Sequence, residues 1–449
     1  MKWPLGVCSA LGGSLTMVTT MMMTTTVAEA QETPPEQIAW DLSEIYPSFD
    51  AWDEAKARLE TRVQGLAAFR GRLGESAAVL RQAYDEISDT EKELARLYVF
   101  AFLKADEDRR VSADQERRGL AAALLSEFGE AVSWVSPELL RVGSATVERY
   151  LDEDPGLEKH AFNIRNTLRQ EPHTLSDEAE QILAATGPVV QGPERIYALL
   201  TSSDITWPTL TLSTGDEITV DQAGYSLHRA SQNRDDRKKV FDAFWGTWNT
   251  YQNSIGQTLD THVKSHVFQA KTRKYENALD AALSGPNIPT AVYRKLIEAT
   301  HRHLPSLHRY FRLRQRMLRL DDLHYYDIYP PLVASDRTFD IEESKALTLA
   351  SAAPLGDHYL SLLERGFAGD WMHVYPQAGK APGAYMYGSV YDVHPYLLLN
   401  HNGQFNDVST FTHEWGHAVH TLLSTEHNPY ETSSYATFTA EIASTTNEV

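Results

Sequence analysis

Two histidines four residues apart, with a glutamate directly after the first, are the side chains best suited to chemistry in this chain. They are His413, Glu414 and His417, in the pattern His-Glu-x-x-His. Four residues make about one turn of an α-helix, so both imidazoles can bind a single Zn²⁺ at about 2.0–2.1 Å. Glu414 leaves the helix beside them, where it can take a proton from a water that the ion activates. The pattern predicts a catalytic zinc site with Glu414 as general base.

The flanking residues favour a half-buried helix for this site. Residues 406–409 supply side chains that can start a helix. An apolar stripe then follows at helical spacing, formed by Phe411, Trp415, Ala418, Val419 and Leu422. Asp407 is a candidate to orient the imidazoles, or it only caps the helix. His420 lies a further turn along and is expected to pack. The simpler alternative is a solvated helix with two unrelated histidines.

A catalytic zinc ion needs a third protein ligand, and Glu441 is the candidate. It lies 28 positions after His413, beyond a turn at Asn428-Pro429. That separation suits a helical hairpin that returns a carboxylate to the first helix. Glu441 and Glu448 are two turns apart on one face, and Glu448 is a candidate to orient an imidazole. From spacing alone, an ordinary surface glutamate explains Glu441 equally well.

Further segments, taken with this site, resemble the oligoendopeptidase F branch of the thimet oligopeptidase family of zinc peptidases. They occur in the family's order along the chain. The matching segments are WDLSEIYP at 40–47, LHRY at 307–310, HYYD at 324–327, GAY at 383–385, PYLLLN at 395–400, HEWGH at 413–417 and AEIAST at 440–445, with Asn447-Glu448 behind the last.

The resemblance implies a zinc-dependent endopeptidase that hydrolyses short oligopeptides. It implies one zinc ion per chain, bound by His413, His417 and Glu441, with Glu414 as the base. It supports a substrate-lining role for Gly383-Ala384-Tyr385, although a plain glycine turn beside a sheet is an equal alternative. The family's oxyanion-binding Tyr and His are expected beyond Val449, so the chain resembles a C-terminally truncated member. The alternative function is an incomplete relative that binds peptide or zinc without turnover.

The chain is expected to be mainly α. Apolar residues recur at helical spacing through most of it, and residues 209–220 predict a β-hairpin. A Gly-, Pro- and aromatic-rich stretch at 366–404 predicts a small β-sheet beside the zinc helix. The resemblance implies an elongated, two-lobed oligopeptidase fold. We expect an N-terminal helical domain at 31–200 and a catalytic domain at 201–449, incomplete at its C-terminus.

Residues 1–30 differ in composition from the rest. Lys2 is the only charge before Glu29, and Ala28-Glu29-Ala30 has the small-x-small form of a signal-peptidase site. This indicates a signal peptide cleaved before Gln31, and therefore export to a bacterial periplasm or secretion. A disordered N-terminal extension on a cytoplasmic protein is the alternative. Cys8 is the only cysteine, so a cleaved chain would form no disulfide.

Composition excludes some functions. The net charge of −20 argues against nucleic-acid binding, which needs a basic face. No stretch reaches the roughly 18 apolar residues that span a membrane. The expected partners are short peptides, and the sequence does not indicate an oligomeric state.

Overall fold

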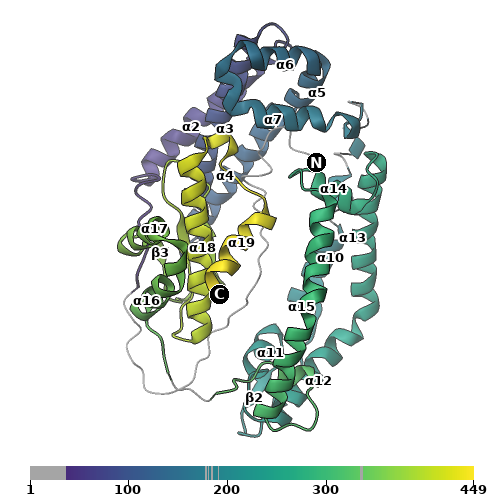
Figure 1. Cartoon of the computed structure of the whole chain (residues 1–449), viewed down its shortest axis with the longest axis vertical. Helices are drawn as coiled ribbons and strands as arrows, with labels where there is room; N and C mark the ends of the chain where they lie inside the picture. The colour runs from purple at the N-terminus through teal and green to yellow at the C-terminus, as the bar shows by residue number, and fades with distance from the viewer. Residues whose placement is uncertain (1–36, 177–178, 180–181, 184–185, 191, 334–336) are drawn as a thin grey trace. The chain divides into compact units, whose positions relative to one another are not determined.

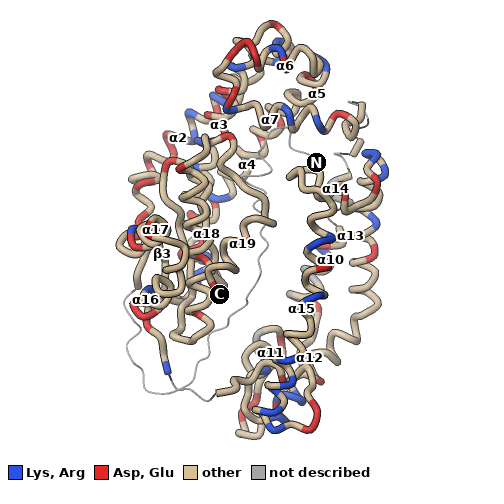
Figure 2. Tube along the Cα trace, in the orientation of Figure 1, with Lys and Arg blue, Asp and Glu red and all other residues tan. Residues whose placement is uncertain are grey.

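The computed structural model describes residues 37–449 except 177–178, 180–181, 184–185, 191 and 334–336. The predicted signal peptide lies outside the described residues, so it and the predicted export stay predictions. Within the described residues, helices dominate and the strands are short, which confirms the mainly α prediction (Figure 1). No helix among them is both long and apolar enough to cross a bilayer. Acidic and basic residues are interspersed along the helices (Figure 2).

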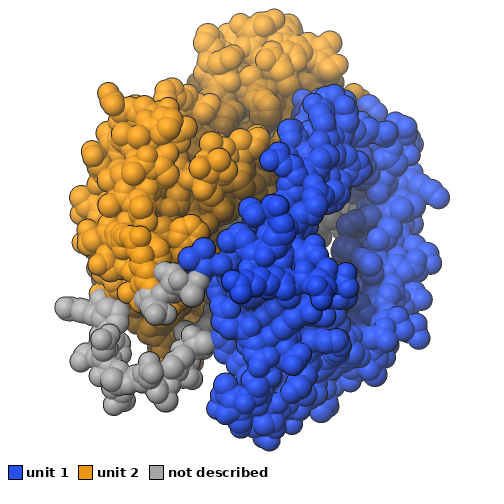
Figure 3. All heavy atoms as spheres, turned by 60° about the horizontal axis from the view of Figure 1, so that its bottom comes forward, with its two compact units in different colours: residues 1, 21–25, 172–336 blue, residues 2–20, 26–171, 337–449 orange. Residues whose placement is uncertain are grey.

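The described chain divides into two compact units, coloured separately in Figure 3. One comprises residues 172–336, and the other combines residues 37–171 with 337–449. The predicted boundary near residue 200 differs from this division, because the N-terminal helices belong to the same unit as the C-terminal segment. A run of amphipathic helices carries no sequence signal of which distant segment covers its apolar face.

The discontinuous unit begins with helices that start at serine caps: Ser48 accepts a hydrogen bond from Ala51 N and Ser76 from Val79 N. Its helices are α2 (Phe49–Gly65), α3 (Ala77–Glu107), α4 (Ser112–Ala131), α5 (Val135–Val142), α6 (Ser144–Glu153), α7 (Glu158–Arg169), α16 (Ile341–Ala352), α17 (Asp357–Ala368), α18 (Phe405–His427) and α19 (Thr437–Glu448). A three-stranded sheet is formed by β3 (Met372–His373), β4 (Tyr385–Tyr387) and β5 (Tyr396–Leu398).

The central strand of this sheet, β5, separates two hydrophobic cores. It pairs in parallel with β3 and antiparallel with β4, which leaves β4 at an edge. Tyr396 and Leu398 pack into a core built mainly from α2 to α7, whereas Leu397 and Leu399 pack against α18. Successive strand residues point to opposite faces, so one strand carries both contacts. The N-terminal helices therefore support the sheet that lies against α18.

The other unit is a helical assembly with the predicted hairpin, in which Thr209 pairs with Thr219 and Thr211 with Glu217. Its elements are α9 (Gly187–Val190), α10 (Gly192–Leu199), β1 (Thr209–Thr211), β2 (Glu217–Thr219), α11 (Gln222–His228), α12 (Arg234–Thr250), α13 (Gln252–Thr272), α14 (Ala278–Ser284) and α15 (Thr290–Met317).

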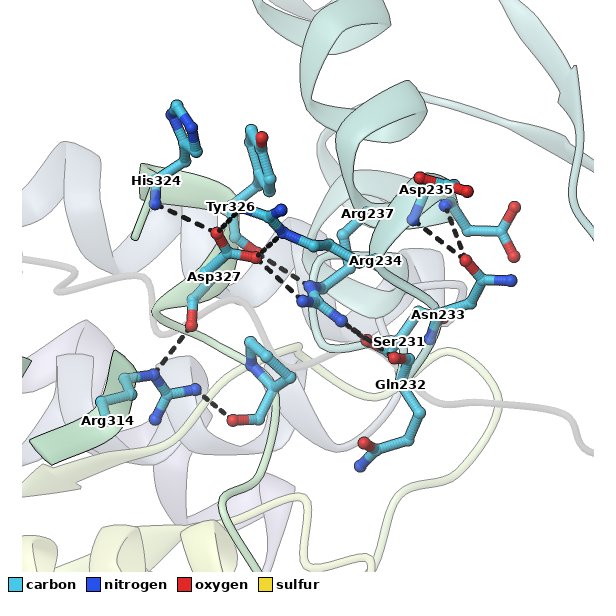
Figure 4. Close-up of polar contacts among 12 residues, drawn as sticks. Ser231, Gln232, Asn233, Arg234, Asp235, Arg237, Arg314, His324, Tyr326 and Asp327 are labelled. Carbon is cyan, nitrogen blue, oxygen red and sulfur yellow. Dashed lines mark hydrogen bonds and ion pairs between the residues drawn. The ribbon is translucent and has the colours of Figure 1, made fainter. Parts of the chain in front are cut away.

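A buried carboxylate connects three segments of that unit. Asp327 is fully buried and accepts from Arg234 and Arg237 of α12, each at 2.9 Å (Figure 4). Its backbone carbonyl accepts from Nε of Arg314, on α15, at 2.8 Å. A buried charge is costly unless it is paired and hydrogen-bonded, so Asp327 has to stay beside these arginines. The arginines thereby hold the loop after α15 against α12.

Candidate metal centre

Helix α18 presents the two histidines on the face opposite to its buried stripe. Phe411 and Trp415 are completely buried in the core beside β5. His413 and His417 are only partly buried, with ring centroids 4.8 Å apart and ring planes nearly perpendicular, at 86°. One turn of helix thus places both imidazoles together, as the spacing predicts.

The third donor comes from α19, which crosses α18 at Gly416. A Cβ atom on Gly416 would lie 2.8 Å from Cα of Ser444 and 2.9 Å from the carbonyl oxygen of Ala443. Only glycine allows this approach, which accounts for the glycine in the fourth place of His-Glu-Trp-Gly-His. Asn447 Nδ2 also donates to the backbone carbonyl of Thr412 at 2.6 Å, and so attaches the end of α19 to α18.

Glu441 converges on the two histidines. Its Oε2 lies 3.6 Å from Nε2 of His413 and 3.8 Å from Nε2 of His417. Donors bound tetrahedrally at about 2.0–2.1 Å from one ion lie about 3.3–3.4 Å apart, so these spacings suit zinc with slight contraction. Among the residues that the structure describes, these three side chains form the one group that could hold a metal ion. The donor set fits the predicted ion.

Other groups fix the orientation of the ligands. Glu448 Oε1 lies 2.6 Å from Nδ1 of His413, which leaves Nε2 facing the ligand position. The backbone carbonyl of Ala440 hydrogen-bonds to His417. Burial also lowers the pKa of His417 to about 4, so its imidazole is neutral at pH 7, as a metal ligand must be. Ser444 Oγ donates to Glu441 Oε2 at 2.9 Å.

Asp407 has a different role from the one proposed for it beside the imidazoles. Its Oδ2 accepts from the backbone N–H groups of Asn402 and Gln404, both at 2.9 Å. These bonds organise the entry to α18, and the bond from Gln404 is one half of a capping box between Gln404 and Asp407. The structure therefore favours the capping alternative.

Glu414 lies on the side of α18 that faces β4. Its side chain is buried, and burial raises the pKa to about 7. The backbone N–H of Met386 donates a hydrogen bond to the carboxylate. A carboxylate with a pKa near 7 can both accept and return a proton at neutral pH.

The predicted substrate-lining segment leads into the edge strand β4. Gly383 has φ +81°, a conformation that favours glycine, and its carbonyl accepts from Asn400 Nδ2 at 2.7 Å. Ala384 packs against the core beside α18. The side chain of Tyr385 turns to the other core, where its hydroxyl donates to Asp106 at 3.2 Å. The phenol of Tyr385 therefore belongs to the N-terminal core and not to the side of the sheet that faces α18.

Two contributors to the site were missed by sequence reasoning. Ser444 lies three residues after Glu441, and the i,i+3 rule for helices could have identified it. Met386 carries no such signal, because its N–H reaches Glu414 only through the register of β4 with β5 and the packing of the sheet on α18.

Comparison with known proteins places the chain among the peptidases. Residues 227–449 match the family described as Peptidase family M3, and residues 138–207 match Oligopeptidase F. The chain is 35% identical over 410 residues to Oligopeptidase PepF of Bacillus subtilis, covering 91% of this chain and 61% of that protein. It is 33% identical to Group B oligopeptidase PepB of Streptococcus agalactiae, covering 92% of this chain and 69% of that protein. The chain belongs to the oligoendopeptidase F family of M3 peptidases.

Solved structures agree with this assignment. The crystal structure of oligoendopeptidase-F from Enterococcus faecium superposes with a TM-score of 0.60 and 28% identity, covering 89% of this chain and 66% of that one. A Chlamydophila abortus protein of known structure gives a TM-score of 0.77 and 30% identity, covering 92% of this chain and 69% of that one. The chain thus spans about two thirds of the length of these relatives.

Proposed function

We propose that the chain carries the catalytic centre of a zinc-dependent endopeptidase that hydrolyses short oligopeptides. The observation that carries this proposal is the convergence of two imidazole nitrogens and one carboxylate oxygen beside a separate, buried glutamate. His413, His417 and Glu441 would hold one zinc ion. When bound, the ion would polarise the scissile carbonyl and lower the pKa of a water molecule.

Glu414 performs the proton transfers in this proposal. Its carboxylate accepts a proton from the attacking water and then passes it to the leaving amine, so the residue is a base and afterwards an acid. Burial, which raises the pKa of this carboxyl group, favours its holding the proton between the two transfers. The Met386 N–H keeps the carboxylate oriented beside β4 throughout the reaction, and burial excludes competing water from it.

The edge strand β4 is the proposed binding site for the peptide backbone. An extended peptide can add to a sheet edge through main-chain hydrogen bonds, which read the backbone more than the side chains. The Gly383-Ala384-Tyr385 segment would contribute backbone groups, and Gly383 leaves open space because nothing lies within 4 Å of the position of a Cβ atom. This mode of binding favours extended oligopeptides of varied sequence.

The test is cleavage of a set of short fluorogenic peptides by the purified chain. We expect activity that a chelator abolishes and added zinc restores. Glu414→Gln is expected to bind zinc normally but to lose at least about 100-fold in kcat, because general-base catalysis contributes about 10²–10⁴-fold. The control is Glu426→Gln, since Glu426 is an exposed residue of the same helix that contacts His358 and no ligand.

The outcomes separate the candidate functions. Full activity in Glu414→Gln would refute the assignment of the base. Zinc binding by the unsubstituted chain without cleavage of any peptide would favour the alternative, a relative that holds peptide or zinc without turnover.

A further inference from the structure

The connection between α18 and α19 is attached to the N-terminal helices by a partly buried ion cluster. The short 3₁₀ helix η7 (Tyr430–Thr432) lies in this connection, and its Glu431 side chain is only 6% exposed. Glu431 accepts from Ser88 Oγ of α3 at 2.9 Å and lies 3.1 Å from Lys159 Nζ of α7. The backbone carbonyl of Glu431 also accepts from Asn163 Nδ2 of α7, at 2.9 Å. One residue therefore has three separate attachments.

The charged groups around this cluster are paired with one another. Lys159 Nζ is shared between Glu431 and Asp85, whose Oδ1 lies 3.0 Å away. The same Asp85 oxygen lies 2.8 Å from Nε2 of the buried His160. Glu91 is close enough for the charge of Glu431 to act on it, and burial raises its pKa to about 8. The cation thus faces two carboxylates.

The position of this cluster matters because α19 is attached at both ends. Asn447 fixes its C-terminal end to α18. The chain entering its N-terminal end is held by the Glu431 cluster and, closer to α19, by hydrogen bonds of Ser433 and Tyr435 to α18. Glu441 lies between the two, six residues before Asn447, or about 9 Å along the helix. A pivot of about 5° around the Asn447 contact would move Glu441 by about 0.8 Å. Metal–ligand distances are held to about 0.2 Å, so such a pivot is larger than the site tolerates.

We propose that Glu431 is a positioning residue for the metal centre: by attaching the α18–α19 connection to α3 and α7, it limits the tilt of α19 and so, together with the crossing at Gly416, positions Glu441 relative to the two imidazoles. This inference rests on the proposed zinc site and adds to it a residue that touches neither the ion nor the peptide. It also assigns a function to the N-terminal helices, which otherwise lack side chains in the centre.

The experiment measures metal binding by the full chain and by Glu431→Gln. Zinc affinity is measured by competition with a chromogenic chelator, and ligand geometry by the absorption spectrum of Co²⁺ bound in place of zinc. We expect the zinc Kd of Glu431→Gln to rise about 10-fold, the low end of the range for residues that support metal ligands, together with an altered Co²⁺ spectrum. Glu426→Gln, on an exposed carboxylate shortly before the connection, is expected to change neither.

A second pair of variants keeps the inference testable if Glu431→Gln does not fold. Lys159→Met removes the cation that faces Glu431, whereas Lys159→Arg preserves its charge. We expect the first to weaken zinc binding and the second to retain near-normal affinity and spectrum.

The results distinguish three cases. A lower unfolding temperature with unchanged zinc affinity and Co²⁺ spectrum would show that the cluster only stabilises the fold, and would overturn the inference while leaving the proposed function intact. The same holds if Lys159→Met and Lys159→Arg bind zinc alike. If the unsubstituted chain binds neither zinc nor Co²⁺, the proposed function itself fails, and the inference fails with it.

Discussion

The close crossing of α18 and α19 makes Gly416→Ala the most informative substitution in the chain. The added Cβ would lie 2.8 Å from Ser444 Cα and 3.0 Å from Asn447 Cβ. Non-bonded carbon atoms prefer separations of about 3.5–4.0 Å, so α19 must retreat by about 0.5–1 Å. Glu441 is carried by that helix, and the retreat exceeds the tolerance of about 0.2 Å for a metal ligand.

The expected effect on stability is small compared with the effect on the metal. Overpacking costs about 1–3 kcal/mol, whereas alanine is favoured over glycine within a helix by about 0.8–1 kcal/mol. The net loss in the free energy of unfolding is therefore about 0–2 kcal/mol. Zinc affinity should fall about 10–100-fold, as when groups that hold metal ligands in place are removed.

Denaturant unfolding and chelator competition measure the two quantities. Gly119→Ala is the matched control, because Gly119 lies within α4 of the same unit and a Cβ atom there would meet nothing within 4 Å. This control should gain up to about 1 kcal/mol in stability and keep its zinc affinity. A Gly416→Ala chain that binds zinc as tightly as its parent would contradict the argument that the helix crossing sets the position of Glu441.

The remaining predictions concern four carboxylates, each substituted singly. Glu448→Ala should weaken zinc binding about 10-fold or more, because His413 loses its contact to this carboxylate. Asp407→Ala should cost about 1–2 kcal/mol of stability, because α18 loses a capping group, and should change zinc affinity little. Chelator competition and urea unfolding of both variants measure these effects, and the reverse pattern would contradict the two assignments. Asp327→Ala should destabilise its own unit by about 3–5 kcal/mol, because the buried Arg237 loses its carboxylate partner, and denaturant unfolding that shows no loss would contradict this. Burial raises the pKa of Glu91 from 4.5 to about 8, so the folded chain retains this proton and stability falls as pH rises across that window; Glu91→Gln should match the parent near pH 4.5 and exceed it at pH 8, and urea midpoints with the same pH dependence in both chains would argue against it.

The site was predictable where its geometry is local. His413 and His417 share a face because helix geometry alone fixes residues four apart. The role of Glu441 was harder to predict, because its spacing from His413 suits a surface glutamate equally well. Only the family resemblance favoured it as a metal ligand. In the structure its carboxylate does lie beside the two histidines, because α18 and α19 cross at close range at Gly416. Whether the three residues bind zinc stays a prediction.

Features that depend on contacts between distant segments were not predictable. Tyr385 was grouped with its neighbours as one substrate-lining segment, yet its phenol points to Asp106, because alternate residues of a strand face opposite sides. The sequence is compatible with either role for Asp407, because the two backbone N–H groups that its carboxylate binds are set by the fold of the loop before α18. The mainly α class followed from periodicity, but the joining of residues 37–171 with 337–449 did not, because helical periodicity shows which face is buried and not what buries it.

The strand β5 has a consequence for how this protein is made in the cell. The core around α2 to α7 is completed by Tyr396 and Leu398, which follow the end of α7 by more than 200 residues. A ribosome adds about 5–20 residues per second, so those helices wait roughly 10–45 s after synthesis before their strand is available. Until then they expose apolar surface that the finished chain covers. Nascent chains of this protein should therefore bind chaperones through α2 to α7, and release them only when Tyr396 and Leu398 have emerged.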